Sequence, residues 1–203
     1  MEPFRTLSAP ACGLPVANID TDQLIPARFM KRSRSEGYGS YLLHDMRFGS
    51  DGAVRPDFPL NHPGAAGARI LVARRNFGAG SSREAAVYAL VDFGIRCVIA
   101  PSFGDIFASN AVNNGLLPAR VEETDAEALL ERLAAEPGEA VVDLDNQRIV
   151  AGNLSVAFKV DPVCRLKLLN GWDDIDLTLA QADAIAAFTE RDREARPWAT
   201  PRR

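Results

Sequence analysis

The sequence predicts a single α/β domain built around a parallel sheet. Three observations carry this prediction: short apolar runs alternate with segments of helical spacing, glycine or proline marks the changes, and the pattern recurs between residues 68 and 121. Such alternation is typical of a β-α-β-α-β unit with parallel strands and right-handed crossovers. Functional loops in these sheets lie at the carboxyl ends of the strands.

The first 67 residues are predicted to hold N-terminal strands and long loops. Asn18, Asp20 and Pro26 interrupt the apolar residues of the early part, and we expect a mobile loop over the polar residues 32–40. Acid pairs such as Asp20 and Asp22 form turns and helix caps more often than catalytic dyads, and we interpret them that way.

The central unit is more regular. In chain order we expect a strand over 68–77 (ARILVARRNF), a helix over 83–94, a strand over 96–101, a helix over 102–115 and a strand over 116–121. Gly94 is placed to end the first helix, and Ser102 is the expected N-cap of the second.

The last third predicts a helix, an antiparallel pair and two further helices. The expected ranges are a helix over 124–138, a strand pair over 139–160, a short helix over 163–171 and a longer one over 177–193. Thr124 and Glu127 have the spacing of a capping box at the start of the first of these.

Composition and charge narrow the function classes. The chain has 203 residues, 47% of them hydrophobic and 25% charged, as in globular proteins. A net charge of -4 gives no electrostatic basis for nucleic acid or an anionic membrane as the main partner. The sequence contains neither an apolar run of bilayer-spanning length nor a signal-peptide pattern at MEPFRTLSAP, so we expect a cytoplasmic protein.

The metal-binding residue types are scattered. Cys12, Cys97 and Cys164 are three widely separated cysteines without a Cys-x-x-Cys pair, which argues against a disulfide framework and a self-contained zinc or iron–sulfur site. His44 and His62 lie in loop-like regions without metal-ligand spacing, and we interpret both as ordinary surface residues. We therefore expect no metal ligands in this chain.

Residues 76–84, NFGAGSSRE, follow the first central strand and form the strongest candidate site. A dinucleotide loop is disfavoured because Gly78 and Gly80 have no third glycine partner and the next strand ends in proline rather than an acid. A Walker A loop is excluded because the sequence has no Gly-Lys-Ser/Thr here.

Two interpretations of this loop remain. Ser81 or Ser82 can cap the following helix, and part of the loop's role is then structural. A cap does not explain Arg83, a cation at the positive end of a helix dipole. Backbone N–H groups, two hydroxyls and a guanidinium together suit a carboxylate, with Glu84 either a helix-start acid or the partner of Arg83.

The motif resembles a known family. Residues 76–118 resemble the swivel domain of the aconitase superfamily, and residues 19–29, IDTDQLIPARF, resemble the start of isopropylmalate isomerase small subunits. The likeness continues through LLNGWDDIDLTL at residues 168–179. It implies a three-layer β/β/α swivel domain over residues 1–203, with N-terminal strands and substrate loop to about 67, a core over 68–121, and a C-terminal hairpin and helices over 122–203.

The resemblance also implies roles for individual residues. Ser81 would be the general base, Ser82 a binding hydroxyl and Arg83 the anchor of a substrate carboxylate. Supporting roles fall to Gly78, Gly80, Glu84 and Asp22. The physical argument agrees for the base, because an alkoxide costs least at a helix N-terminus beside a cation.

The implied reaction is dehydration and rehydration, which would interconvert 2- and 3-isopropylmalate through isopropylmaleate in leucine biosynthesis. Removing a hydroxyl calls for a Lewis acid, which the family supplies as a [4Fe–4S] cluster on three cysteines of a large subunit. The resemblance therefore implies a half-enzyme without a cofactor of its own, active only with that large subunit and its small dicarboxylate substrate.

Substrate choice is assigned to residues 38–48, YGSYLLHDMRF. Tricarboxylate-handling relatives resemble YGSRRGN here, whereas this chain has Tyr41, Leu42 and Leu43, which favour an isopropyl group over a second carboxylate. The alternative is that the two leucines are core residues. Ala85 stands where the family usually has histidine, and this departure keeps citraconate, dimethylmaleate and homoaconitate open as alternative substrates. The alternative outside the enzymes is a non-catalytic carboxylate-binding module.

Overall fold

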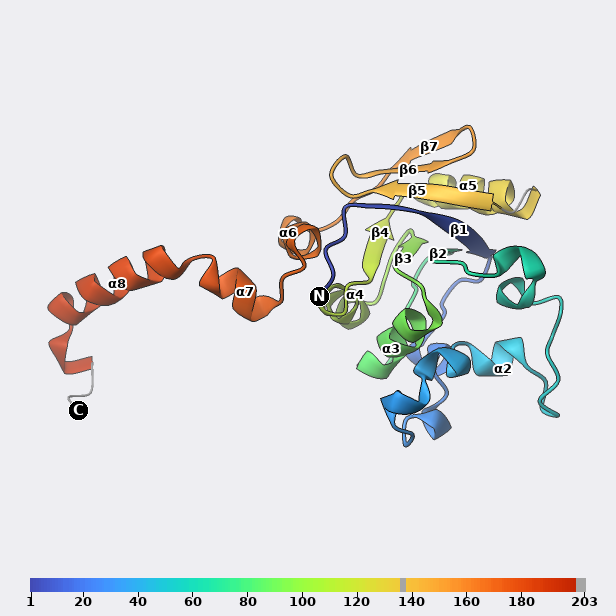
Figure 1. Cartoon of the computed structure of the whole chain (residues 1–203), viewed down its shortest axis with the longest axis horizontal. Helices are drawn as coiled ribbons and strands as arrows, with labels where there is room; N and C mark the ends of the chain where they lie inside the picture. The colour runs from blue at the N-terminus through green and yellow to red at the C-terminus, as the bar shows by residue number, and fades with distance from the viewer. Residues whose placement is uncertain (136–137, 200–203) are drawn as a thin grey trace. The chain divides into compact units, whose positions relative to one another are not determined.

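The computed structural model describes residues 1–135 and 138–199 of the chain (Figure 1). It divides into two compact units, Met1–Gly171 and Trp172–Arg203. The prediction of a single domain over residues 1–203 stays a prediction. No helix of the described residues has the length and apolarity needed to cross a membrane.

The first unit contains one seven-stranded sheet, in the order β4-β3-β2-β1-β5-β6-β7. Its strands are β1 (Thr6–Leu14), β2 (Ile70–Ala73), β3 (Cys97–Ala100), β4 (Leu117–Arg120), β5 (Gly138–Asp143), β6 (Arg148–Ala151) and β7 (Leu154–Ala157). β1 to β4 pair in parallel, and β1, β5, β6 and β7 pair antiparallel in succession. The predicted α/β class with a central parallel β-α-β-α-β unit is confirmed.

Helices connect the parallel strands. The α-helices of this unit are α1 (Thr21–Leu24), α2 (His44–Arg47), α3 (Glu84–Phe93), α4 (Asp105–Asn113), α5 (Glu123–Ala135) and α6 (Pro162–Asn170). Short 3-10 helices occupy 27–29, 34–36, 38–41, 59–61 and 63–65. Gly94 ends α3 in the left-handed conformation (φ 112°), as predicted.

Each face of the parallel strands has its own core. Leu71 and Val98 point into a cluster with α3, whereas Ile70 and Ile99 point into one with α5 and the antiparallel strands. Alternate residues of a strand point to opposite faces, and fully buried strands such as β2 need apolar residues on both. The sheet curls so that β5 to β7 and α5 cover one face of the parallel strands (Figure 1), which gives the predicted layered arrangement.

Several local predictions are wrong. Ser102 does not cap α4: the helix begins after Gly104, and the Ser102 hydroxyl instead accepts a hydrogen bond from the Asn76 backbone N–H at 2.8 Å. Thr124 does not start a capping box, because α5 already begins at Glu123. Glu127, the other predicted member, pairs with Arg74 at 2.7 Å.

Two predicted element ranges also change. The predicted strand pair over 139–160 is a three-stranded meander, since a turn over 144–147, with Gln147 at φ 51°, divides the first predicted strand into β5 and β6. The predicted strand over 68–77 is shorter, because β2 ends at Ala73 before two exposed arginines.

The second unit holds α7 (Asp174–Leu179), α8 (Ala182–Ala195) and a 3-10 turn over 197–199. Asp173 caps α7 by accepting hydrogen bonds from two backbone N–H groups at 2.8 Å, and Asp20 caps α1 in the same way at 2.7 Å. The predicted capping role is confirmed for Asp20. The single long helix expected over 177–193 is interrupted at 180–181, so two helices form.

Candidate functional site

The candidate loop, residues 76–83, lies between two neighbouring segments of backbone. On one side the Gly78 N–H donates to the Ile19 carbonyl at 2.7 Å, and on the other the Phe77 N–H donates to the Ser102 carbonyl at 3.0 Å. These segments continue from the carboxyl ends of β1 and β3, with β2 between them. The sheet therefore holds the loop at the edge where its fold class places function.

The glycines of the loop are required by its shape. Gly78 and Gly80 have φ values of 71° and 98°, in the left-handed region that disfavours other residues. Gly78 also packs against an aromatic ring, because a Cβ built on it would lie 2.2 Å from the Phe107 ring. The loop comes this close to α4 because this position has no side chain.

We expect Gly78→Ala to lower the free energy of unfolding by several kcal/mol, because backbone strain adds to a clash with a packed ring. Gly52→Ala is the matched control: its φ is 80°, yet nothing lies within 4 Å of the added Cβ. That variant should lose only about 1 kcal/mol. Urea unfolding of both chains checks the prediction, and equal losses would contradict the close packing at Gly78.

Ser81 is fixed through its backbone while its side chain stays exposed. The Thr21 hydroxyl donates to the Ser81 carbonyl at 3.0 Å, and the Thr21 N–H donates to the Ala79 carbonyl at 2.9 Å. Thr21 is itself buried. The anchored backbone and the exposed hydroxyl suit a residue that acts on a bound molecule.

Neither serine caps α3, so that prediction is wrong. Arg83 is the N-cap residue, and its side chain makes no capping hydrogen bond. Among the described residues, no hydrogen bond uses the hydroxyl of Ser81 or Ser82, and both residues are exposed. The two hydroxyls are thus available to a ligand.

Arg83 is held by an acid from another part of the chain. Its guanidinium forms an ion pair with Asp22 of α1, and the side chains are 19% and 54% exposed respectively. Glu84 is the first residue of α3 and accepts a hydrogen bond from the Asn114 amide at 3.0 Å. Of the two roles considered for Glu84, the structure favours a helix-start acid.

A small cavity of about 200 Å³ adjoins Ser81 and Arg83, whereas Ser82, Asp22 and Glu84 do not line it. It is lined by Thr21, Gly78, Gly80, Ser81, Arg83, Gly104, Asp105, Ile106 and Phe107. The first turn of α4 forms one wall, and its N-cap makes no side-chain hydrogen bond. The positive ends of α3 and α4 and one arginine therefore act on one cavity, an arrangement that favours an anion.

The volume of this cavity limits the size of a ligand that it can enclose. Pockets that enclose a small molecule usually measure about 300–1,000 Å³. The cavity of about 200 Å³ lies below this range.

Sequence reasoning missed two contributors to this cavity, Thr21 and the first turn of α4. Thr21 lies inside the segment IDTDQLIP, where the flanking acids drew attention instead. The start of α4 was misplaced because a serine is a better cap than glycine by propensity. Gly104 is needed for space: a Cβ there would lie 2.6 Å from the Gly78 carbonyl oxygen.

The predicted substrate loop lies elsewhere. Leu42 and Leu43 are fully buried in the core beside α3, and Tyr41 stacks on Phe29 with ring centroids 4.2 Å apart. None of these three side chains lines the cavity that contains Ser81. In this structure the two leucines are core residues, the alternative that the sequence left open, and direct contact with a substrate is not supported.

The cysteines do not fit an iron–sulfur cluster. Cys12 and Cys97 are buried in different cores on opposite faces of the sheet. Burial raises the pKa of the Cys12 thiol to about 11 and raises the pKa of the Cys97 thiol as well, whereas cluster ligands are thiolates. Within residues 1–135 and 138–199, no group of three His, Cys, Asp or Glu residues could hold a metal ion.

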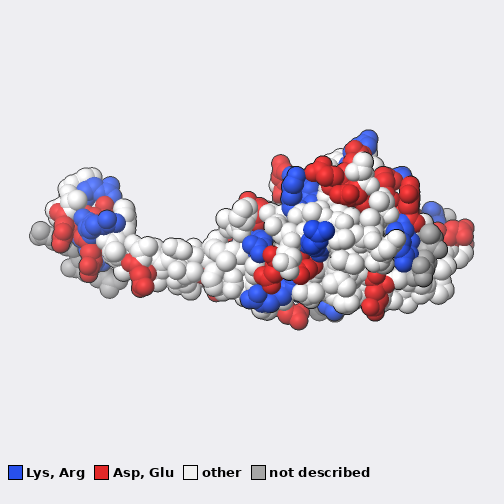
Figure 2. Space-filling view, turned by 90° about the horizontal axis from the view of Figure 1, so that it is seen from above, with Lys and Arg blue, Asp and Glu red and all other residues white. Residues whose placement is uncertain are grey.

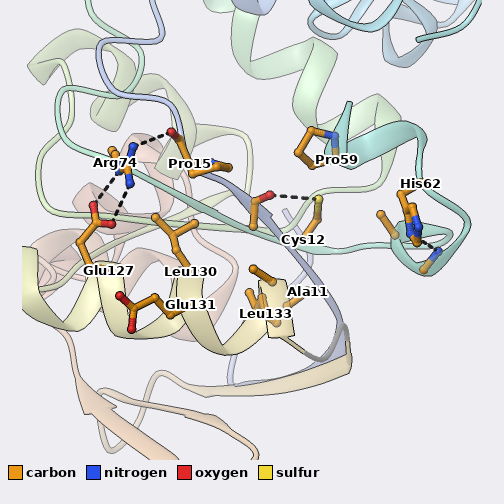
Figure 3. Close-up of a pocket in the computed structure, with 14 residues that line it drawn as sticks. Ala11, Cys12, Pro15, Pro59, His62, Arg74, Glu127, Leu130, Glu131 and Leu133 are labelled. Carbon is orange, nitrogen blue, oxygen red and sulfur yellow. Dashed lines mark hydrogen bonds and ion pairs between the residues drawn. The ribbon is translucent and has the colours of Figure 1, made fainter. Parts of the chain in front are cut away.

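Another cavity, of about 460 Å³, lies between β1, α5 and the segment 59–65 (Figure 3). Its walls are mostly apolar, and none of the predicted site residues lines it. At one end Arg74 donates to the Glu127 carboxylate at 2.7 and 2.9 Å and to the Pro15 carbonyl at 2.9 Å. These acceptors use three of the five N–H donors of the guanidinium.

Comparison with known proteins places the chain in a family. Residues 1–124 match the aconitase C-terminal domain, and residues 174–202 match the C-terminal domain of 3-isopropylmalate dehydratase small subunits. The 3-isopropylmalate dehydratase small subunit of Shouchella clausii is 48% identical, over 94% of this chain and 97% of that relative. The corresponding protein of Rhodospirillum centenum is 48% identical, over 98% of this chain and 99% of its own length.

A solved structure agrees with these sequences. The crystal structure of a 3-isopropylmalate dehydratase from Methanocaldococcus jannaschii superposes with a TM-score of 0.61 and 25% identity, over 91% of this chain and 99% of that one. The match to the aconitase C-terminal domain, over residues 1–124, includes the strand–loop–helix unit that holds Ser81 and Arg83. The chain belongs to the family of 3-isopropylmalate dehydratase small subunits.

Proposed function

We propose that this chain forms one wall of a 3-isopropylmalate dehydratase site, with Ser81 as general base and Arg83 as carboxylate anchor. The reaction interconverts 2- and 3-isopropylmalate through isopropylmaleate in leucine biosynthesis, and the chain acts as the small subunit of a hydro-lyase. The observation that carries the proposal is the exposed Ser81 hydroxyl beside Arg83, in a cavity flanked by two helix N-termini.

The chemistry of this chain follows from that arrangement. Arg83 and the helix dipoles hold one carboxylate of the substrate. The Ser81 hydroxyl, as alkoxide, takes the proton from the neighbouring carbon, and the positive charges around it lower the cost of the anion. Ser82 offers a second hydroxyl for orienting the substrate.

The rest of the site belongs to a large subunit. The small cavity and the small-subunit names of the relatives support such a partner. A [4Fe–4S] cluster on that subunit would supply the Lewis acid for the leaving hydroxyl. Charges of both signs are mixed on the face shown in Figure 2, which gives no basis for a nucleic-acid surface there. A cytoplasmic location stays a prediction.

Arg83→Lys tests the anchor in the assembled enzyme. A lysine keeps the charge but loses the forked donors that match a carboxylate, so we expect KM for 3-isopropylmalate to rise about 10- to 100-fold. Steady-state kinetics at the absorbance of isopropylmaleate measure this. The control is Arg74→Lys, whose ion pair with Glu127 lies at the other cavity. An unchanged KM in the Arg83 variant would remove the anchor from the proposal.

A further inference from the structure

Arg83 is occupied before any substrate arrives. Its partner, Asp22, is brought to the loop by the backbone bonds around Thr21 described above. The pair is unequal: the arginine side chain is 19% exposed and the aspartate side chain 54% exposed. A mostly buried cation is therefore neutralised by an acid that remains largely in water.

This inequality makes the acid replaceable. Leaving a mostly buried guanidinium without a counter-charge is costly, so the empty site needs an anion. The aspartate keeps much of its hydration in the pair, so its release into water costs little when another carboxylate takes its place on Arg83. A carboxylate on Arg83 can therefore be exchanged for another at small cost.

We propose that Asp22 is a placeholder carboxylate, which occupies Arg83 in the substrate-free subunit and yields it to the substrate carboxylate. This inference rests on the proposed role of Arg83 as carboxylate anchor. It predicts the direction in which Asp22 changes substrate affinity. The acid weakens substrate binding, because it competes with the substrate for one guanidinium and its charge repels a dianion. Removing that charge must tighten substrate binding.

A purely positioning role predicts the opposite sign. If Asp22 served only to orient Arg83 for the substrate, its loss would loosen the arginine and weaken binding. The two roles are thus separated by the direction of one change.

The test uses the assembled enzyme with Asp22→Asn, which keeps the shape and removes the charge. We expect KM for 3-isopropylmalate and the inhibition constant of succinate, a plain dicarboxylate, both to fall about three- to tenfold. Asp22→Ser should do the same, and Asp22→Glu, which restores the competing charge, should return both values toward those of the parent. The matched control, Glu127→Gln, removes an ion-paired carboxylate at the other cavity and should change neither.

A rise in either constant, or no change, in both charge-removing variants overturns the placeholder role. The proposed function is tested separately by Ser81→Ala in the same complex. If Ser81→Ala is inactive while Asp22→Asn weakens binding, only the placeholder inference fails. If Ser81→Ala turns over normally, the proposed function fails whatever Asp22 does.

Discussion

Ser81→Ala is expected to lower kcat of the assembled enzyme by about 10²- to 10⁴-fold, the usual contribution of a general base. The substitution removes one exposed hydroxyl and no described hydrogen bond of that hydroxyl, so the fold loses nothing by it. The backbone contacts of Ser81 with Thr21 use the carbonyl oxygen and persist in alanine. We therefore expect Ser81→Ala to lose turnover while its assembly with the large subunit is unchanged.

The control is the neighbouring hydroxyl. Ser82→Ala should raise KM or lower kcat by less than Ser81→Ala, because a binding hydroxyl orients the substrate without taking its proton. Size-exclusion chromatography of both complexes establishes that the large subunit still binds. Near-normal turnover of Ser81→Ala, or a larger loss in Ser82→Ala, would contradict the assignment of the base.

The sequence predicted this part of the site because the signal is local. A buried strand, a glycine pair and a helix-start arginine follow one another within residues 70–83, and each has a direct structural meaning. The same locality predicted α3 and its end at Gly94. Local patterns do not predict that Thr21 and Asp22 contact the loop. These two residues lie about sixty positions earlier in the chain, and the register of the sheet brings them next to Ser81 and Arg83.

The two wrong cap predictions at Ser102 and Thr124 have one physical origin. Ser102 and Thr124 were assigned as caps by propensity, and tertiary contacts moved both helix starts. Ser102 forms its hydrogen bond with Asn76 of the neighbouring segment instead. A preference of about 1 kcal/mol at a cap is smaller than the packing that places a helix on a sheet.

In the segment 38–48, the resemblance to relatives and the structure assign different roles to Leu42. Comparison with tricarboxylate-handling relatives assigned Leu42 to the substrate, and a Leu42→Arg variant would then accept a second carboxylate. The structure places this leucine at 0% exposure, beside α3 and away from the Ser81 cavity. The same substitution therefore tests the core assignment against the specificity hypothesis.

Leu42→Arg is expected to leave the subunit largely unfolded. An unpaired charge in the core costs several kcal/mol, which is comparable with the whole stability of a typical domain, about 5–15 kcal/mol. Leu42→Ala should fold but lose about 2–5 kcal/mol, because it leaves a cavity without adding a charge. Circular dichroism during urea unfolding of the isolated chains measures both.

Leu166→Arg is the control, since that leucine is 42% exposed and can place a guanidinium in water. It should unfold close to the parent concentration of urea. A Leu42→Arg subunit that folds, assembles and gains affinity for a tricarboxylate would mean that the 38–48 segment opens in the complex. Substrate choice would then belong to these leucines after all. If the variant fails to fold while Leu166→Arg is stable, selection of the isopropyl group has to come from residues that line the assembled site.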